Sequence, residues 1–305
     1  MSNHSEGHNH SHAHGHHHPV SGRIGVAFFL NFFFTIIEFI GGWLTNSTAI
    51  MADAVHDLGD TLSIGLGWFL SKVSDKGADH YFSYGYRRLS LLGAFVNGAV
   101  LVAGSIWVLF EAVPRLANPE MPHAQGMLGL AILGVVVNGY AAYKLSDGKT
   151  LNERVLNWHL MEDVLGWVAV LVVSIVLIFV DWPILDPLLS IAFTLFILVN
   201  VTKTLKETVK LFLQATPDQG LREQIYQQLL AVNQVAEIHH FHLWSLDGES
   251  HVLTAHLVLK QPLDNGLQAE VKSDVAEGLA QYQLAHTTIE FEQPEECCRD
   301  SHLKR

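Results

Sequence analysis

Long apolar stretches separated by short polar segments dominate the first two thirds of this chain. Six of them have roughly the 20 residues that an α-helix needs to cross the hydrocarbon core of a bilayer. They cover residues 24–44, 49–71, 89–112, 125–146, 157–180 and 183–203. The pattern therefore predicts a six-helix transmembrane domain within residues 21–214, with both ends of the chain on the same side of the membrane.

Lysine and arginine are unevenly distributed among the segments that join these stretches. The loops on one side carry only Arg115, whereas the other side carries most of the basic residues. Because basic loops tend to stay in the cytosol, we expect both termini to be cytosolic. The residues on that side are Arg23, Lys72, Lys76, Arg87, Arg88, Lys144, Lys149, Arg154, Lys203, Lys206 and Lys210.

After Pro217 the sequence becomes polar and its periodicity changes. A helix is predicted at about 218–231, strands at about 235–245 and 250–259, a helix after Gly266, and a strand at about 286–293. This αββαβ order predicts a small cytosolic α+β domain of ferredoxin or metallochaperone type over residues 215–295, followed by a tail at 296–305. A domain of this size has a small core and would gain stability from dimerisation or from bound metal.

Composition narrows the function. Residues 1–20 hold eight of the nineteen histidines and few apolar side chains, which predicts a disordered, metal-binding cytosolic tail. The chain is 49% hydrophobic with a formal net charge of −12, which favours a membrane protein and argues against a nucleic-acid partner. Its adjacent cysteines, Cys297 and Cys298, cannot build a disulfide framework. No Gly-x-x-x-x-Gly-Lys-Ser/Thr loop indicates a nucleotide.

Two apolar stretches contain a histidine and an aspartate four residues apart. His56 and Asp60 lie in the second stretch, and His159 and Asp163 lie in the fifth. Residues at i and i+4 project from one face of a helix, and two such pairs supply the nitrogen and oxygen ligands of a tetrahedral zinc site. A single pair is also explained by mutual pairing or a proton relay, but the repeated spacing favours a metal site.

Other polar residues within the apolar stretches receive different interpretations. Asp53, Asp57 and Glu162 lie near the proposed ligands at other helical angles, and we expect them to line a vestibule or support the ligands. A further four are interpreted as structural, because interhelical hydrogen bonds commonly explain such residues. These four are Glu38, Asn31, Asn97 and Asn138.

Together, these features resemble the cation diffusion facilitator family over nearly the whole chain. The resemblance is strongest to its zinc-exporting bacterial and ZnT-like branch, through Ala52-Asp53-Ala54-Val55-His56, Phe82-Ser83-Tyr84-Gly85-Tyr86-Arg87-Arg88 and His242-Leu243-Trp244-Ser245-Leu246. It implies a homodimer that exchanges cytosolic metal for external protons by alternating access. The transport site would comprise His56, Asp60, His159 and Asp163, with histidine at the first position associated with zinc over cadmium.

The resemblance also bears on two further possible metal sites. Some members bind metal in the loop after the second span through an Asp and two His, but here Asp79 is accompanied by Phe82 and Tyr86, so we predict no site there and interpret His80 as a solvated loop residue. A cytosolic zinc site, carried over by position, would comprise His239, His256 and Glu292, with Cys297 and Cys298 as additional thiolate ligands.

Strand alternation limits which cytosolic histidines can share an ion. It places His240 and His242 on one face of their strand and His239 on the other. We interpret His240, His251 and His286 as surface residues of a half-buried sheet.

The sequence thus favours a multi-pass transporter of the bacterial inner membrane that exports divalent metal, zinc preferred, and is not an enzyme. Two alternatives from other classes remain. A membrane-bound zinc sensor would signal through the cytosolic domain. An intramembrane metalloprotease would need a general base and usually a His-Glu-x-x-His sequence, which this chain lacks.

Overall fold

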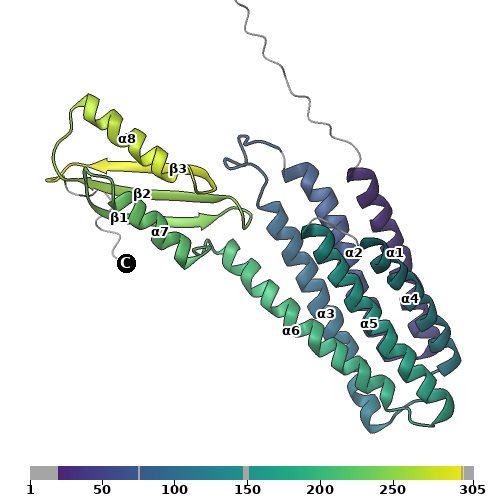
Figure 1. Cartoon of the computed structure of the whole chain (residues 1–305). Coiled ribbons are helices and arrows are strands. Elements are labelled where there is room, and N and C mark those ends of the chain that lie inside the picture. Colours follow the sequence, from purple (N-terminus) through teal and green to yellow (C-terminus); the bar gives the residue numbers. More distant parts are fainter. Residues whose placement is uncertain (1–19, 75, 147–150, 297, 299–305) are drawn as a thin grey trace, which may run out of the picture.

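A bundle of long helices is joined through its last member to a small α+β domain (Figure 1). The structure is a computed structural model that describes residues 20–74, 76–146, 151–296 and 298. The predicted tail at 1–20 lies almost wholly outside the described residues, as do Cys297 and residues 299–305. The helices of the bundle are α1 (Val20–Thr45), α2 (Thr48–Ser74), α3 (Leu89–Ala117), α4 (Ala124–Leu145), α5 (Leu151–Phe179) and α6 (Leu185–Phe212).

Within the described part of the chain, five of these helices are long and apolar enough to cross a membrane. The exception is α2, which is 27 residues long but carries Asp53, Asp57 and Asp60. Its lower hydropathy comes from the residues that sequence reasoning singled out for metal chemistry. The chain is therefore a multi-pass membrane protein, and the predicted fold class is confirmed.

The bundle divides into two groups of helices. Helix α2 packs against α1, α3 and α6, while α4 packs mainly against α5, which meets α2 along only a short length. The α4–α5 pair is held closely because the buried ring of Trp167 lies on Gly134, where an added Cβ would come within 2.1 Å of the indole. Small residues let transmembrane helices approach in this way.

The first turn of α2 is anchored to α6 by a buried carboxylate. Asp186 accepts hydrogen bonds from the Thr48 amide at 2.7 Å, the Thr48 hydroxyl at 2.8 Å and the Ala49 amide at 3.3 Å. Ser190 also donates to the Thr48 carbonyl at 2.9 Å. An acidic partner at a helix N-terminus satisfies amides that lack intrahelical acceptors and complements the helix dipole. Asp186 therefore fixes the position of α2 relative to α6.

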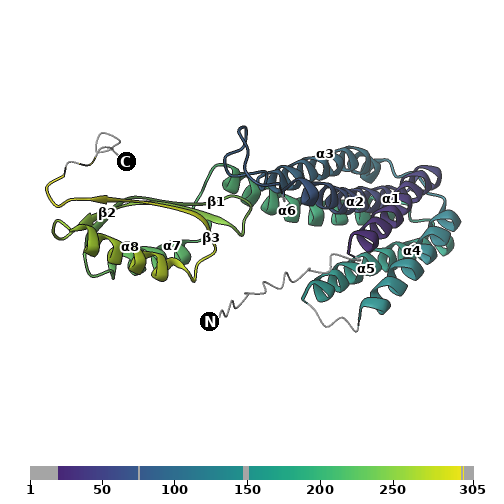
Figure 2. The same cartoon turned by 90° about the horizontal axis from the view of Figure 1, so that it is seen from above.

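The C-terminal domain has the predicted αββαβ order. Its elements are α7 (Gln219–Leu230), β1 (Val235–Ser245), β2 (His251–Leu259), α8 (Asn265–Leu279) and β3 (Leu284–Glu292). The strands lie in the order β1-β2-β3, with β1 antiparallel and β3 parallel to β2. Helices α7 and α8 cover one face of the sheet (Figure 2). The core between sheet and helices contains Ile225, Leu229, Leu253, Leu257 and Val275.

Candidate metal centres

The two His/Asp pairs predicted from the sequence meet inside the helix bundle. His56 and Asp60 project from α2, and His159 and Asp163 project from α5. His56 Nε2 lies 3.8 Å from Asp60 Oδ2 and 3.6 Å from Asp163 Oδ1. His159 Nε2 lies 2.9 Å from Asp60 Oδ2 and 4.0 Å from Asp163 Oδ2. The structure thus brings all four residues together, two from each helix; we call them the membrane tetrad.

The spacing within the membrane tetrad suits a tetrahedral cation. One ligand atom from each residue can be chosen so that all four lie within 4.8 Å of one another. Tetrahedral ligation with bonds of about 2.0 to 2.2 Å places ligand atoms about 3.3 to 3.6 Å apart. Only the His159–Asp60 pair, at hydrogen-bond distance, would have to widen appreciably. The donor set of two imidazoles and two carboxylates is one that zinc accepts readily.

A cavity of about 230 Å³ adjoins the membrane tetrad and reaches His56 and Asp163. Asp53 and Glu162 also line it, together with apolar residues of α5 and α6. This placement agrees with the predicted vestibule role of these two acids. Asp57 is buried nearby, and its backbone carbonyl accepts a hydrogen bond from the Asn31 side-chain amide at 3.4 Å.

The four polar residues interpreted as structural behave in two ways. Asn31 and Asn97 form interhelical hydrogen bonds, to Thr61 at 3.1 Å and to Ser63 at 2.7 Å. The buried Glu38 on α1 pairs with Asp57 on α2 through a side-chain hydrogen bond, whereas the Asn138 amide nitrogen has no hydrogen-bond partner among the described residues. The interhelical role predicted for Glu38 is therefore supported by its contact with Asp57, and the role of Asn138 stays a prediction.

The loop between α2 and α3 is organised by hydrogen bonds around Asp79. Its carboxylate accepts from the amides of Tyr81 and Phe82, both at 2.8 Å, and from the Tyr86 hydroxyl at 2.6 Å. The Tyr86 hydrogen bond, followed by those from the two amides, lowers the pKa of Asp79. His80 is exposed. A carboxylate committed to three donors is poorly suited to bind a metal ion, and the absence of a loop site stays a prediction.

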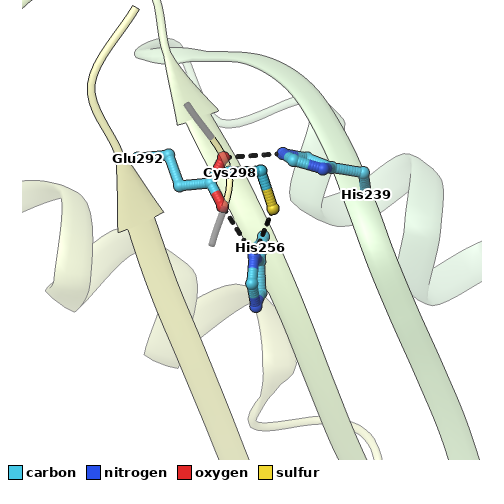
Figure 3. A group of neighbouring side chains, drawn as sticks. All are labelled: His239, His256, Glu292 and Cys298. Carbon is cyan, nitrogen blue, oxygen red and sulfur yellow. Dashed lines mark hydrogen bonds and ion pairs between the residues drawn. The ribbon is translucent and has the colours of Figure 1, made fainter. Parts of the chain in front are cut away.

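A second cluster lies on the sheet of the C-terminal domain (Figure 3). The buried Glu292 on β3 joins two histidines: its Oε2 lies 2.8 Å from His239 Nε2, and its Oε1 lies 2.6 Å from His256 Nδ1. The sulfur of Cys298 lies 3.6 Å from His256 Nδ1. Four ligand atoms again lie within 4.8 Å of one another. We call His239, His256, Glu292 and Cys298 the cytosolic cluster.

Glu292 is held in its ionised form despite its burial. Burial raises its pKa, but hydrogen bonds from Cys298 and His256 outweigh that effect, and the pKa lies below its usual value. An ionised carboxylate beside two imidazoles and a thiol matches the donor preferences of zinc. Cys297, the remaining predicted ligand, lies outside the described residues.

Strand alternation is interrupted at the cytosolic cluster. The β1–β2 register shifts between His239 and His242, and His240 has φ of 49°. As a result the His240 ring lies 5.3 Å from that of His239 and 4.9 Å from that of His256. The expectation that His239 and His240 occupy opposite faces was therefore wrong, because a bulge breaks the period of two.

Sequence reasoning also missed an acid beside the cytosolic cluster. Glu290 Oε2 lies 3.7 Å from His256 Nε2. The signal was present, because Glu290 and Glu292 are two apart on one strand and share a face.

Two family models match the chain. The cation efflux transmembrane domain matches residues 24–213, and the cytoplasmic domain of cation efflux proteins matches residues 217–294. The chain is 30% identical over 294 residues to a cadmium, cobalt and zinc/H⁺–K⁺ antiporter of Bacillus subtilis, covering 95% of this chain and 91% of that protein. It is 32% identical over 276 residues to the zinc transporter ZitB of Yersinia pseudotuberculosis, covering 89% and 88%. It is 30% identical over 262 residues to the metal cation efflux system protein CzcD of Cupriavidus metallidurans, covering 85% and 82%.

Proposed function

The chain belongs to the cation efflux family, and we propose that it carries Zn²⁺ out of the cytosol in exchange for protons through the membrane tetrad. It is a transporter and not an enzyme. The observation that carries the proposal is the convergence of His56, Asp60, His159 and Asp163 at distances suited to one tetrahedral ion. Its relatives include a zinc transporter and an antiporter that exchanges metal for protons, which supports the same substrate and exchange.

Proton exchange follows from the chemistry of these ligands. An imidazole binds zinc only when its coordinating nitrogen is deprotonated, and a carboxylate binds it when ionised. The same atoms that hold the metal therefore also accept protons. Zinc arriving from one side displaces protons, and protons arriving from the other side displace zinc.

The packing of the bundle supports alternating access. His56 and Asp60 move with α2, which is packed on α1, α3 and α6, whereas His159 and Asp163 move with the α4–α5 pair. The two groups meet where α5 contacts α2 and α6 and where α1 contacts α4, and each of these contacts is less extensive than the packing within the groups. A relative rotation of the groups would open the membrane tetrad to one side at a time. Such a rotation also separates or compresses the two ligand pairs, which would alter zinc affinity during the cycle.

The cytosolic cluster is proposed to bind a regulatory zinc ion. His239, His256, Glu292 and Cys298 would hold it, with Cys297 as a further thiolate ligand. The fit rests on the buried carboxylate between two imidazoles and on a sulfur within reach. When bound there, the ion would cross-link all three strands and the C-terminal tail.

Further features of the proposal follow from the family and the charge distribution. We propose a homodimer in the bacterial inner membrane with both termini in the cytosol. Residues 21–214 would form the transmembrane domain of each subunit, and residues 215–295 its cytosolic domain. The first 20 residues would bind metal near the cytosolic entrance and raise its local concentration.

The decisive test is zinc flux into proteoliposomes with an imposed pH gradient. We expect the parent protein to transport zinc, and Asp60→Ala and Asp163→Ala each to abolish measurable transport. Asp181→Ala removes an exposed aspartate from the loop between α5 and α6 and serves as the matched control, with flux equal to the parent. Equal flux in all four proteins would reject the proposed site.

The same experiment addresses a second function that the cytosolic cluster favours, a membrane-bound zinc sensor. A sensor would bind zinc at the cytosolic cluster without moving it across the bilayer. Its output would be insensitive to Asp163→Ala and sensitive to loss of Glu292.

A further inference from the structure

A polar pocket lies where the loop between α2 and α3 meets the C-terminal domain. Its volume is about 580 Å³. The loop contributes Lys76, Ser83, Tyr84 and Arg87 to its lining, and β3 contributes His286. The pocket, which we call the junction pocket, is separate from both metal centres.

The loop side of the junction pocket has a defined conformation. Besides accepting three hydrogen bonds through its side chain, Asp79 donates its amide to the Phe82 carbonyl at 3.1 Å. The ring of Phe82 packs on that of Tyr86, with centroids 4.6 Å apart. Gly85 has φ of 72°, and a Cβ there would come within 3.0 Å of the Lys76 carbonyl. These contacts hold Tyr84 and Arg87 facing the C-terminal domain.

Two contacts close the junction pocket against that domain. Arg87 Nη1 donates to Ser250 Oγ at 2.7 Å, at the turn between β1 and β2. The ring of Tyr84 meets that of His286 edge to face, with centroids 5.7 Å apart. The hydrogen bond to Ser250 uses only one of the five N–H groups of the Arg87 guanidinium, so the others remain available to a ligand.

The charge of the junction pocket is unusual in a chain with a net charge of −12. None of the described residues that line it is acidic, whereas Lys76 and Arg87 are cationic and His286 gains charge when protonated. Two nearby acids are engaged elsewhere. Asp79 is hydrogen-bonded within its own loop, where its charge also interacts with that of Lys76. Asp247 accepts from the amides of Glu249 at 2.9 Å and Ser250 at 2.6 Å.

We propose that the junction pocket binds a phosphate-bearing anion between Lys76 and Arg87. Arginine offers phosphate a fork of parallel donors and lysine adds a compact charge. Lys76 follows the end of α2 at Ser74, and Arg87 precedes the start of α3 at Leu89. Figure 1 shows these two helix ends facing the C-terminal domain. Both an anionic lipid headgroup and a soluble phosphate compound are therefore candidate sources of the anion. Bound there, the anion bridges the membrane domain and β3 and steadies their contact.

Binding can be measured on the full-length protein in detergent without zinc, so the result does not depend on transport. The probes are inorganic pyrophosphate, a short-chain phosphatidylglycerol and, as a zwitterionic control, the matching phosphatidylcholine. Isothermal titration calorimetry gives the dissociation constant of each. We expect saturable binding of at least one anionic probe, and binding at least about tenfold weaker in the Lys76→Gln/Arg87→Gln double variant, because two charge-assisted hydrogen bonds are lost.

Two single variants separate anion binding from structural effects. Arg88→Gln removes the neighbouring arginine, which does not line the pocket, and is expected to bind like the parent. Ser250→Ala removes the hydrogen bond to Arg87 but leaves both cations, and is expected to bind within about threefold of the parent.

The pattern of probe binding identifies the source of the anion. Binding of phosphatidylglycerol alone identifies a lipid headgroup, and binding of pyrophosphate alone identifies a soluble phosphate compound. Competition between the two identifies one site open to both. Failure of both anionic probes to bind, or equal affinity in the parent and the double variant, would overturn the proposal.

Discussion

The membrane tetrad and the cytosolic cluster use similar ligands on supports of very different stiffness. In the tetrad, two helices that touch along only a short length each contribute a histidine and an aspartate. In the cluster, the ligands on strands come from β1, β2 and β3, which are hydrogen-bonded neighbours of one sheet. A site built across a weak helix contact can change its geometry, whereas a site built across a paired sheet keeps it.

Burial differs in the same sense. The side chain of Glu292 is 4% exposed, whereas those of Asp163 and Asp60 are 11% and 25% exposed, and a cavity reaches Asp163. A transported ion must enter and leave, so its carboxylates need access to water. An ion that stabilises a fold is retained better by ligands that water does not reach. Under the proposed function, the same donor chemistry would serve cargo in one domain and a regulatory ion in the other.

The largest effect is expected from removing one tetrad ligand. His159→Ala should lower zinc flux in proteoliposomes at least about 100-fold, because even residues that only support metal ligands typically change affinity about 10- to 100-fold. His123→Ala, a change at the exposed N-cap histidine of α4, should retain flux near the parent value. Retained flux in His159→Ala would break the assignment of the tetrad to cargo.

Glu292→Gln should separate the two centres. Loss of the buried charge between His239 and His256 should weaken zinc binding by the cytosolic cluster about 10- to 100-fold. Flux through the tetrad at saturating zinc should change less than about threefold, since the ligands of the tetrad are intact. Equilibrium dialysis with zinc and the flux assay measure the two quantities, and complete loss of flux would show that the centres are not separable.

Asp186→Ala should test the idea that α2 and α6 move as one unit. The substitution leaves the Thr48 hydroxyl and two amides of α2 without their buried acceptor, at a cost of about 1–3 kcal/mol in the free energy of unfolding. Denaturant unfolding in detergent, followed by tryptophan fluorescence, measures this loss. Zinc affinity of the cytosolic cluster should not change, and Asp181→Ala again provides the exposed control. Parent-like stability would mean that the anchor contributes little.

The smallest effect is expected in the loop between α2 and α3. The pKa of Asp79 is lowered in the folded chain, so its contribution to loop stability is present above the ordinary carboxyl pKa and is lost as pH falls through the lower folded value. Tyr86→Phe removes the largest cause of that shift. Hydrogen exchange at the Tyr81 and Phe82 amides should therefore quicken at a higher pH in the variant than in the parent. Identical exchange profiles in both proteins would contradict this prediction.

Local sequence determined much of this protein. Apolar runs long enough for a bilayer specified the transmembrane helices, and the alternation after Pro217 specified αββαβ, because helix and strand periods are properties of neighbouring residues. The i, i+4 spacing placed His56 with Asp60 and His159 with Asp163 on single helical faces for the same reason. The positions of Glu292, His239 and His256 followed from family resemblance rather than from periodicity.

Tertiary structure decided the rest, because it depends on contacts between residues far apart in the chain. Only packing brings α2 to α5 and so joins the two half-sites. Only the bulge in β1 turns His240 toward His256 against strand alternation. The pairing of Glu38 with Asp57 and the meeting of Arg87 with Ser250 also depend on which helices and loops become neighbours. Periodicity reports which face a side chain takes, and only the assembled fold determines what that face meets.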